Sequence, residues 1–384
     1  MKQIMAYQFR LYPNKEQQVL ITKTFGSARF IYNTCLTMIK NNKYISKFDM
    51  FKEIPNISNT YQFLKEVDSM VLRNSISDLY KGIDKYLKKQ ANYPNYKKKG
   101  NKESYRTNYI TSTYKGKKYS NIKLDLINKT ITLPKLKEIK ISGYRKLNEL
   151  DGRIINATVK QIGNKYYVSL CVERNIILPT KKENNIVGID IGIKNLVTTS
   201  DNNVYGNPNY IKKYEKRIKI LNKSLSRKNK GSKNYIKTLN KLKEVYRKQK
   251  NARKKTVEDI VSKIVKQNDI IVAEKLKIKD MIEKKRNKIK SLRKNIINST
   301  FGYILKQLEY KTKILNKTFY QVNTYYPSSQ TCCCCNNIDK SMKDINKRIY
   351  ECKKCKNIID RDLNASINIM LEGLNIYYKE KYNF

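Results

Sequence analysis

The sequence predicts an α+β chain of several domains, and three observations lead to that prediction. Hydrophobic residues recur at helical spacing over residues 16–40 and 61–90, and short strand-like runs fill residues 108–178. Two apolar runs, at 186–192 and 270–274, each carry a single acid. The chain has 384 residues, of which 40% are hydrophobic. A single hydrophobic core rarely stabilises a chain of this length, so we expect two to four domains.

The strongest compositional signal is positive charge. Lysine and arginine number 82 against 32 aspartates and glutamates, a formal net charge of +50. Because the basic residues are spread over most of the length, we expect a protein that wraps a polyanionic partner rather than one with a basic tail. Nucleic acid is the first candidate for that partner, and an anionic membrane surface is the second. Lys, Asn, Ile and Tyr all have AT-rich codons, so part of the excess of lysine reflects nucleotide composition. The net charge therefore overstates what the function requires.

Several classes of protein are excluded. The first residues lack the apolar stretch of a secretory signal, and no segment is long enough to span a bilayer, so we expect no membrane partner. We expect a cytoplasmic, nucleoid-associated protein whose thiols stay reduced. The sequence has no histidine. A histidine general base, a His-hydrophobic-His metal pair and a zinc site with imidazole ligands are therefore impossible.

The N-terminal third begins with a strand and continues with helices. Residues 5–11 alternate as in a strand, and Pro13-Asn14-Lys15 end it. Helical spacing follows over 16–40 and 61–90. The segment 93–106 mixes Tyr with Lys and Arg, which suits phosphate contacts with base stacking, although a solvated surface loop is the plainer interpretation.

The predicted secondary structure changes twice in the middle of the chain. Residues 108–178 predict a small β-barrel or sheet, and residues 181–185 predict a linker. Residues 208–266 predict two basic antiparallel helices that break at residues 230–233. Another helix is predicted over residues 301–316.

Three carboxylates stand in three separate motifs. They are Asp190 in VGIDIGIKN, Glu274 in IIVAEKL and Asp362 in DRDLNAS. The first two motifs are typical of buried strands in a mixed sheet, where a carboxylate is costly unless it is paired or metal-bound. A strongly cationic chain that still gathers carboxylates indicates divalent metal held for phosphodiester chemistry.

Each acid also has a plain structural interpretation. Asp190 could begin a turn, Glu274 could pair with the lysine that follows it, and Asp362 is well placed to cap the helix predicted over LNASINIML. Asp360 is a rival to Asp362 in the same segment and ranks second because it lies further from the helix start.

Six of the eight cysteines fall between residues 332 and 355. Two Cys-x-x-Cys pairs with 16 residues between them are typical of a tetrahedral structural zinc site, and we assign its ligands as Cys332, Cys335, Cys352 and Cys355. Cys333 and Cys334 are spare or alternative ligands. The two remaining cysteines, at positions 35 and 171, lie in apolar patterns and should be core residues.

The ordered set of motifs GIDIGIKNL, AEKL, YPSSQTC..C, C..C and DRDLNASINI resembles the TnpB (OrfB) family of insertion-sequence proteins, relatives of the type V CRISPR effector nucleases. The opening YQFRLYPNKEQQVLITKTFGSARFIYN and the stretch GRIINATVKQIGNKYYVSLCVE are also similar, so the resemblance covers nearly the whole chain. The sequence departs from the family at five positions, where the residues are Asn336 and Lys356 in place of Gly, Lys255 and Glu258 in place of Asp and His, and Phe301 in place of Trp.

The resemblance implies a RuvC-like nuclease domain of RNase H fold with a zinc ribbon, and an N-terminal β-barrel wedge domain with a helical insertion. The expected wedge comprises residues 1–13 and 106–182, and the helical recognition insertion residues 14–105. The expected nuclease domain comprises residues 183–324 and 358–384, and the zinc ribbon residues 325–357.

The resemblance also implies a function: an RNA-guided, metal-dependent DNA endonuclease of a transposable element, with a guide RNA from the end of its own element and double-stranded DNA as target. Asp190 would bridge two Mg²⁺ ions, Glu274 and Asp362 would each complete one site, and one Zn²⁺ would be structural. The alternatives are an RNA-guided DNA-binding repressor with weak or lost cleavage, a strand-transfer transposase, and a zinc-ribbon RNA-binding protein without catalysis.

Two basic surfaces are candidates for holding nucleic acid: the helices at 211–255 and the segment 93–106. Because no base-reading module is recognisable, we expect pairing with RNA to choose the target sequence. The residues expected to contact nucleic acid are Tyr93, Tyr96, Lys97, Lys98, Lys99, Arg106, Lys213, Arg217, Arg227, Arg247 and Arg253.

Overall fold

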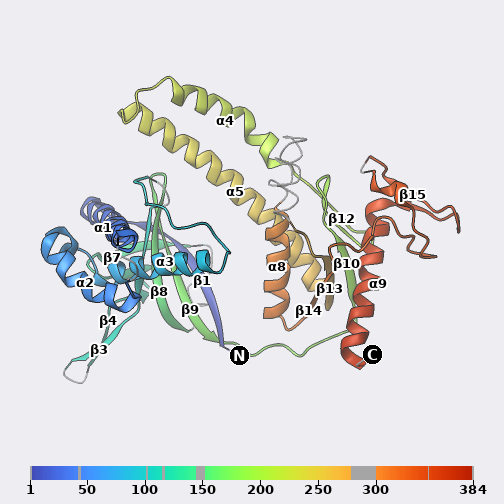
Figure 1. Cartoon of the computed structure of the whole chain (residues 1–384), viewed down its shortest axis with the longest axis horizontal. Helices are drawn as coiled ribbons and strands as arrows, with labels where there is room; N and C mark the ends of the chain where they lie inside the picture. The colour runs from blue at the N-terminus through green and yellow to red at the C-terminus, as the bar shows by residue number, and fades with distance from the viewer. Residues whose placement is uncertain are drawn as a thin grey trace. The chain divides into compact units, whose positions relative to one another are not determined.

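A computed structural model describes residues 2–41, 45–100, 103–114, 117–143, 152–277, 300–344 and 346–382 (Figure 1). The chain divides into two compact units, Met1–Ile177 and Leu178–Phe384. Among the helices of the described ranges, none combines the length and the apolar character that a membrane crossing requires.

A curled antiparallel sheet forms the first unit. Its seven strands lie in the order β2-β8-β9-β1-β7-β6-β5, and β3 and β4 pair separately as a hairpin. Hydrogen bonding between the described strands leaves β2 and β5 as two ends, so the sheet is curled rather than a closed barrel. The strands are β1 (Lys2–Tyr12), β2 (Ser104–Asn108), β3 (Thr111–Tyr114), β4 (Lys117–Ser120), β5 (Lys123–Asp125), β6 (Thr130–Leu133), β7 (Lys137–Ser142), β8 (Arg153–Ile162) and β9 (Lys165–Asn175).

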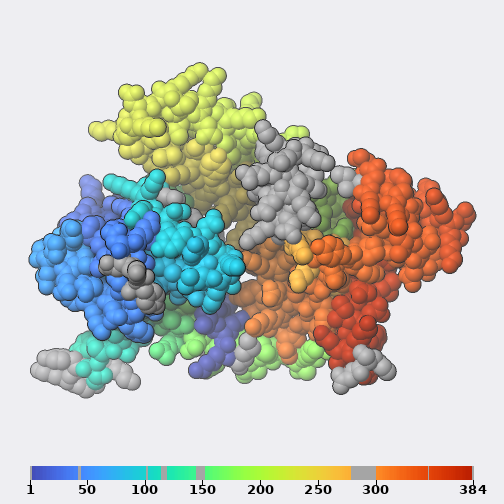
Figure 2. Space-filling view, in the orientation of Figure 1, coloured from blue at the N-terminus to red at the C-terminus, as the bar shows by residue number. Residues whose placement is uncertain are grey.

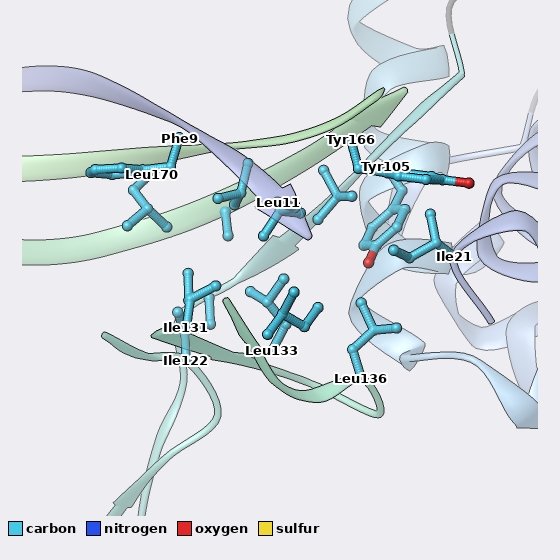
Figure 3. Packing of buried hydrophobic residues seen from close by; sticks show 14 of the residues in the cluster. Phe9, Leu11, Ile21, Tyr105, Ile122, Ile131, Leu133, Leu136, Tyr166 and Leu170 are labelled. Atoms are coloured by element: carbon cyan, nitrogen blue, oxygen red, sulfur yellow. The ribbon is translucent and has the colours of Figure 1, made fainter. Parts of the chain in front are cut away.

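The core of this unit lies inside the curl (Figure 3). Phe9 and Leu11 of β1 and Leu170 of β9 face Ile131 and Leu133 of β6, and none of these five residues is more than 2% exposed. The alternation along β1 that predicted a strand therefore places one face of it in the core.

Helices cover the first unit. They are α1 (Lys15–Asn41), α2 (Lys47–Thr60), the short 3₁₀ helix η1 (Gln62–Glu66) and α3 (Ser69–Leu87). The helical spacing over residues 61–90 is interrupted because Asp68 caps α3, its carboxylate accepting the Met70 N–H at 3.1 Å. Cys35 of α1 is fully buried in the core between these helices, whereas Cys171 of β9 is only partly buried.

A five-stranded mixed sheet forms the centre of the second unit, in the order β12-β11-β10-β13-β14. β10, β13 and β14 run parallel, and β11 and β12 run antiparallel to their neighbours. This is the mixed sheet that the two apolar runs predicted. The strands are β10 (Ile186–Asp190), β11 (Asn195–Thr199), β12 (Val204–Gly206), β13 (Ile270–Glu274) and β14 (Thr318–Val322).

Helices pack on both faces of this sheet, which makes three layers (Figure 1). Helices α5 (Lys233–Gln267) and α8 (Phe301–Ile314) cover one face, and α9 (Arg361–Tyr382) covers the other. Along β13, Ile271 and Ala273 point to the first layer while Ile270 and Val272 point to the second. A central strand buried on both faces explains why this run is apolar throughout.

A basic helical hairpin extends from the layered part of this unit. Helix α4 (Tyr210–Ser226) runs back along the first half of α5, as the break at residues 230–233 predicted. Ser232 begins α5 by accepting the Tyr235 N–H at 3.1 Å. Over residues 210–255 the sequence holds 19 lysines and arginines against two glutamates. The hairpin therefore presents a long cationic surface.

Candidate active site and metal centre

Two strand ends place two of the three acids side by side. β10 and β13 are parallel neighbours with Ile189 opposite Ala273, and β10 ends at Asp190 while β13 ends at Glu274. The two carboxylates thus leave adjacent strands at the same edge of the sheet. Ligands of α/β sheets commonly bind at this carboxyl edge.

Two glycines bring helix α9 directly onto these strands. A Cβ on Gly188 of β10 would overlap the backbone of Ser366, and a Cβ on Gly373 of α9 would overlap the side chain of Val272. Helix and sheet therefore approach more closely than any side chain at these two positions would allow. This approach carries the first turn of α9, with Asp362, to the edge where the other two acids lie.

The three acids influence one another electrostatically. Burial raises the pKa of Asp190 well above its usual range, and the charges of Glu274 and Asp362 raise it further. Burial also raises the pKa of Glu274 and of Asp362, and the charge of Asp360 adds to the effect at Asp362. Carboxylates that are desolvated together favour a bound cation, because a cation removes both the burial penalty and the repulsion.

Glu274 is oriented by a serine that the sequence did not reveal. The hydroxyl of buried Ser328, which follows β14, donates a hydrogen bond to Oε1 of Glu274. This hydrogen bond favours the ionised carboxylate and partly offsets the effect of burial on its pKa.

The capping role belongs to Asp360, so the alternative interpretation of Asp362 as the helix cap is wrong. Oδ1 of Asp360 accepts the N–H groups of Asp362 at 2.9 Å and of Leu363 at 3.1 Å. Asp362 is the second residue of α9, and its carboxylate is 3.9 Å from the guanidinium of Arg348. Because Asp360 caps the helix, the Asp362 carboxylate is not needed for capping.

Two buried asparagines tie the site to the cysteine-rich segment. Nδ2 of Asn364 donates to the carbonyl of Thr331 at 2.7 Å, and Nδ2 of Asn368 donates to Ser328 O at 2.8 Å and to Thr331 O. Oδ1 of Asn364 also accepts the Cys333 N–H at 3.0 Å. Both amides are at most 1% exposed. The backbone from Ser328 to Cys333 is therefore fixed to the helix that carries Asp362.

Four cysteines of the described chain lie close enough together to hold one metal ion. The Sγ atoms of Cys332, Cys335, Cys352 and Cys355 all lie within 4.8 Å of one another. Among the described residues, this is the group of potential ligands close enough to share one ion. The segment carries β15 (Ile349–Glu351), β16 (Ile358–Asp360) and the 3₁₀ helix η3 (Lys340–Lys343), and it forms a lobe beside α9 (Figure 2).

The two cysteine pairs have the same backbone geometry. In the first, the Asn336 N–H bonds to Cys332 O at 3.0 Å, and in the second the Lys356 N–H bonds to Cys352 O at 2.9 Å. Asn336 and Lys356 have φ of 58° and 59°, in the left-handed region that favours glycine. Asn336 and Lys356, which replace the glycines of the TnpB family, thus occupy the strained position after each cysteine pair.

The cysteine chemistry suits a bound cation. The backbone N–H of Cys355 lowers the pKa of the Cys352 thiol, so the thiolate forms most readily there. Burial and hydrogen bonds with the neighbouring thiols raise the pKa of Cys355 in turn. Cys333 and Cys334 lie outside the four-sulfur group, with their Sγ atoms 3.9 Å apart.

The predicted nucleic-acid residues of the first unit differ in their surroundings. Lys97 lies 3.8 Å above the Tyr32 ring, and Lys40 lies 4.6 Å from the Tyr96 ring and 6.0 Å from the Tyr93 ring. Arg106 is paired with Asp78 at 2.8 Å. Lys98 and Lys99 are exposed. Residues 93–106 thus contact α1 and α3, and only part of their positive charge is available to nucleic acid. Residues 101 and 102 of this segment lie outside the described ranges.

The predicted residues of the second unit also fall into two groups. Lys213, Arg217 and Arg227 are exposed on the helical hairpin. Arg247 pairs with Glu244 three residues earlier at 2.5 Å, which compensates its charge. Arg253 lines a pocket together with Lys194, a residue that the sequence did not single out.

Three sequence families match parts of the chain. The family OrfB_IS605, described as "Probable transposase", matches residues 169–285, and a Cas12f1-like TNB domain matches residues 301–369. A family described as a helix-turn-helix domain matches residues 1–44. In that range the structure describes one strand, β1, and one helix, α1, so the described residues hold no pair of helices joined by a turn.

Two curated relatives match almost end to end. "Putative RNA-guided DNA endonuclease InsQ" of Escherichia coli (strain K12) is 27% identical over 391 residues, covering 97% of this chain and 93% of the relative. "Putative RNA-guided DNA endonuclease" of Streptomyces pristinaespiralis is 26% identical over 377 residues, covering 96% and 89%. Among solved structures, a Cas12f1-sgRNA-target DNA complex matches with a TM-score of 0.54 and 14% identity, covering 96% of this chain and 98% of that one, which is a likeness of fold.

Proposed function

Because the chain belongs to the TnpB (OrfB) family of insertion-sequence proteins, we propose that it is an RNA-guided, metal-dependent DNA endonuclease of a transposable element. The observation that carries this proposal is the meeting of Asp190, Glu274 and Asp362 at one sheet edge, where their charges act on one another. Near-complete coverage by relatives that are named as RNA-guided DNA endonucleases supports the guided character.

The second unit is the proposed nuclease domain, of RuvC type within the RNase H fold. Its support is the mixed five-stranded sheet in the order β12-β11-β10-β13-β14 with helices on both faces. The likeness to the Cas12f1 complex is consistent with that fold. The curled sheet of the first unit, with its helices, is the proposed wedge and recognition region.

The donor set of the active site fits divalent metal. Three carboxylates with raised pKa values and no histidine in the chain offer only hard oxygen ligands, which Mg²⁺ prefers. Two Mg²⁺ ions held by Asp190, Glu274 and Asp362 would activate water and stabilise the leaving 3′ oxygen. Ser328 fixes the orientation of the Glu274 carboxylate, and α9 fixes the position of Asp362.

The four-cysteine group is the proposed site of one structural Zn²⁺. Four thiol ligands within mutual reach and a closed shell of protein donors are typical of structural rather than catalytic zinc. Fully buried Tyr350, together with Cys332, Cys352 and Met342, forms the small core that surrounds this site.

Two alternatives remain distinct in their outcome. An RNA-guided repressor would bind its target without cutting, and a strand-transfer transposase would join DNA ends rather than hydrolyse them. The intact set of three acids favours cleavage over the repressor. Strand joining would appear as covalently linked DNA products.

The deciding experiment uses purified, RNA-free protein with Mg²⁺ and plasmid DNA. RNA transcribed from the 3′ flank of the gene is added or omitted, and an unrelated RNA of equal length is the control. We expect sequence-specific double-strand cuts with 5′-phosphate and 3′-hydroxyl ends only with the flanking RNA. Equal, sequence-specific cutting without RNA would favour an ordinary endonuclease, and guided binding without cuts would favour the repressor.

A further inference from the structure

A cationic pocket of about 320 Å³ lies in the second unit, and none of the three acids is among the described residues that line it. Its walls come from the loop after β10, the start of α4 and the middle of α5. The residues that matter for its chemistry are Lys194, Asn209, Tyr210, Arg253 and Thr256. The volume corresponds to roughly ten water molecules at about 30 Å³ each, which is ample for a phosphate group with part of its sugar.

Arg253 is the unusual residue in this pocket. Its Nε is buried and has no hydrogen-bond partner, and within the described ranges no carboxylate pairs with its guanidinium. Burial lowers the pKa of Arg253, which reflects the cost of holding this charge away from water. Arg253 is partly buried, and none of the described carboxylates pairs with it, so its guanidinium is available to an anion. The planar guanidinium matches a phosphate with two parallel hydrogen bonds.

The other groups of the pocket also favour an anion. Lys194 adds a second positive charge, and the N-terminus of α4 directs the partial positive charge of its first N–H groups toward the same space. The hydroxyls of Tyr210 and Thr256 hydrogen-bond to each other at 3.0 Å, so one of the two keeps its proton for a ligand oxygen. No acidic residue is among those that line the pocket in the described part of the chain.

The pocket is joined to the active site by a short, fixed loop. Lys194 is four residues after Asp190, which limits their Cα separation to about 14 Å. Asn207 holds the loop by donating its side-chain amide to Ile193 O at 2.9 Å and its backbone N–H to Lys194 O at 3.2 Å.

We propose that the Arg253–Lys194 pocket binds a backbone phosphate of the DNA strand being cut, a few nucleotides away from the bond that the three acids hydrolyse. The proposal rests on the endonuclease function proposed above and deepens it, since it names a strand-positioning site. Phosphates follow one another at about 3.4 Å along the axis of a strand, so the separation of pocket and acids spans a small number of nucleotides. A phosphate held there would fix the register of the strand without reading its bases.

Binding is tested without any need for cleavage. The chain has no tryptophan, so Tyr210→Trp creates a single fluorescent reporter in the pocket wall. We expect the oligonucleotide (dT)₆ to quench this reporter, and Arg253→Gln or Lys194→Gln in the same background to weaken the apparent affinity about tenfold. Lys263→Gln removes the same charge from an exposed site on α5 and should leave the titration unchanged. Lys194 is exposed, so its variant is informative even if Arg253→Gln does not fold.

Cleavage supplies a second, position-specific readout. DNA substrates that each carry one neutral methylphosphonate linkage, at successive positions of the target strand, are cleaved by the complete RNA-loaded protein. We expect a neutral linkage at one particular position, distant from the cut, to slow cleavage by the wild-type protein about tenfold. The same linkage should not slow Arg253→Gln further, because both changes remove the same contact.

The outcomes separate the two proposals. Quenching that does not depend on Arg253 or Lys194 overturns the pocket, as does tighter quenching by (rU)₆, which would assign it to RNA. Quenching that does depend on both residues, in a protein that never cuts DNA, supports the pocket while the endonuclease function fails.

Discussion

Asp190, Glu274 and Asp362 are polar residues at the ends of otherwise apolar segments, and each is desolvated by the packing around it. Three negative charges in one partly buried place lower the stability of the folded chain unless cations neutralise them. This structural cost is what the metal-binding role proposed above would offset. Asp360, which lies next to them, has a separate task because it caps α9.

Changing any of the three acids to alanine should abolish cleavage while RNA binding stays nearly intact. Loss of a group that only supports a metal ligand lowers metal affinity or activity about 10–100-fold. Loss of a ligand itself should therefore lower the cleavage rate more than about 100-fold. Cleavage rates and RNA affinity are measured side by side. Asp360→Ala is the matched control, for which we expect retained cleavage and a loss of about 1 kcal/mol of stability from the missing cap. Cleavage that survives Asp362→Ala and disappears in Asp360→Ala would reverse this assignment.

Ser328→Ala should slow cleavage by about tenfold or more, because a hydrogen bond to a charged group contributes about 1.5–3 kcal/mol. The reason is that Glu274 would lose the donor that orients its carboxylate. Ser329→Ala is the control, since its neighbouring hydroxyl makes no described hydrogen bond to Glu274. Single-turnover rates at saturating Mg²⁺ distinguish the two variants, and equal rates would remove Ser328 from the site.

At the scale of elements, the decisive contact is that of α9 with β10 and β13. Gly188 and Gly373 lie where any side chain would collide with the opposing element. The cysteine-rich segment is attached to the same helix through Asn364 and Asn368, so the four cysteines and the acids share one support.

Gly188→Ala should lower the free energy of unfolding by about 1–3 kcal/mol, as overpacking in a close contact does. The collision is with the backbone of Ser366, which cannot move aside without shifting α9. Cleavage should fall as well, because Asp362 moves with the helix. Gly206→Ala is the control, since a Cβ there meets no atom within 4 Å. Urea unfolding of both variants measures the difference, and equal stability would show that α9 adapts without cost.

The chain should bind one zinc ion, needed for local folding rather than for the chemical step. Cys352→Ser/Cys355→Ser should lose the metal, as measured by elemental analysis, whereas Cys333→Ser/Cys334→Ser should retain it because those thiols lie outside the group. Because Asn364 and Asn368 connect the knuckle to α9, we expect loss of zinc to weaken cleavage indirectly. Soluble, active protein without zinc would refute the assignment.

At the scale of the whole molecule, charge is distributed over both units, but it is most concentrated on the α4–α5 hairpin. Pairing by Asp78 and Glu244 removes Arg106 and Arg247 from the available charge. The exposed residues Lys213, Arg217 and Arg227 remain as the hairpin's candidates for phosphate contact.

The triple variant Lys213→Gln/Arg217→Gln/Arg227→Gln should bind guide RNA with a weaker salt dependence. Each lost phosphate contact on a single strand removes about 0.7 from the slope of log K against log salt, so three contacts remove about 2. A variant with three exposed lysines of the first unit neutralised, at positions 123, 129 and 140, has the same net charge. Equal slopes for the two variants would mean that only overall charge, and not the hairpin, attracts the RNA.

The sequence by itself determined the parts that depend on local spacing. Cys-x-x-Cys pairs predict a knuckle because the ligands are close in the chain, and a one-acid apolar run predicts a strand that ends in a carboxylate. The helix spacing of α1, α4, α5 and α8 and the mixed sheet were predicted for the same reason. The N-terminal β-barrel that the resemblance implied is, over the described strands, a curled sheet with two ends.

Only the tertiary structure decided which distant residues meet. Ser328 contacts Glu274 across 54 residues, and Asn368 contacts Ser328 across 40, contacts that no periodicity encodes. That Arg106 is paired with Asp78, and that Arg253 has no carboxylate partner among the described residues, depends on which elements pack together. The physical reason is that spacing along a chain fixes neighbours within a few residues, whereas packing of sheet and helix selects the partners of a buried polar group.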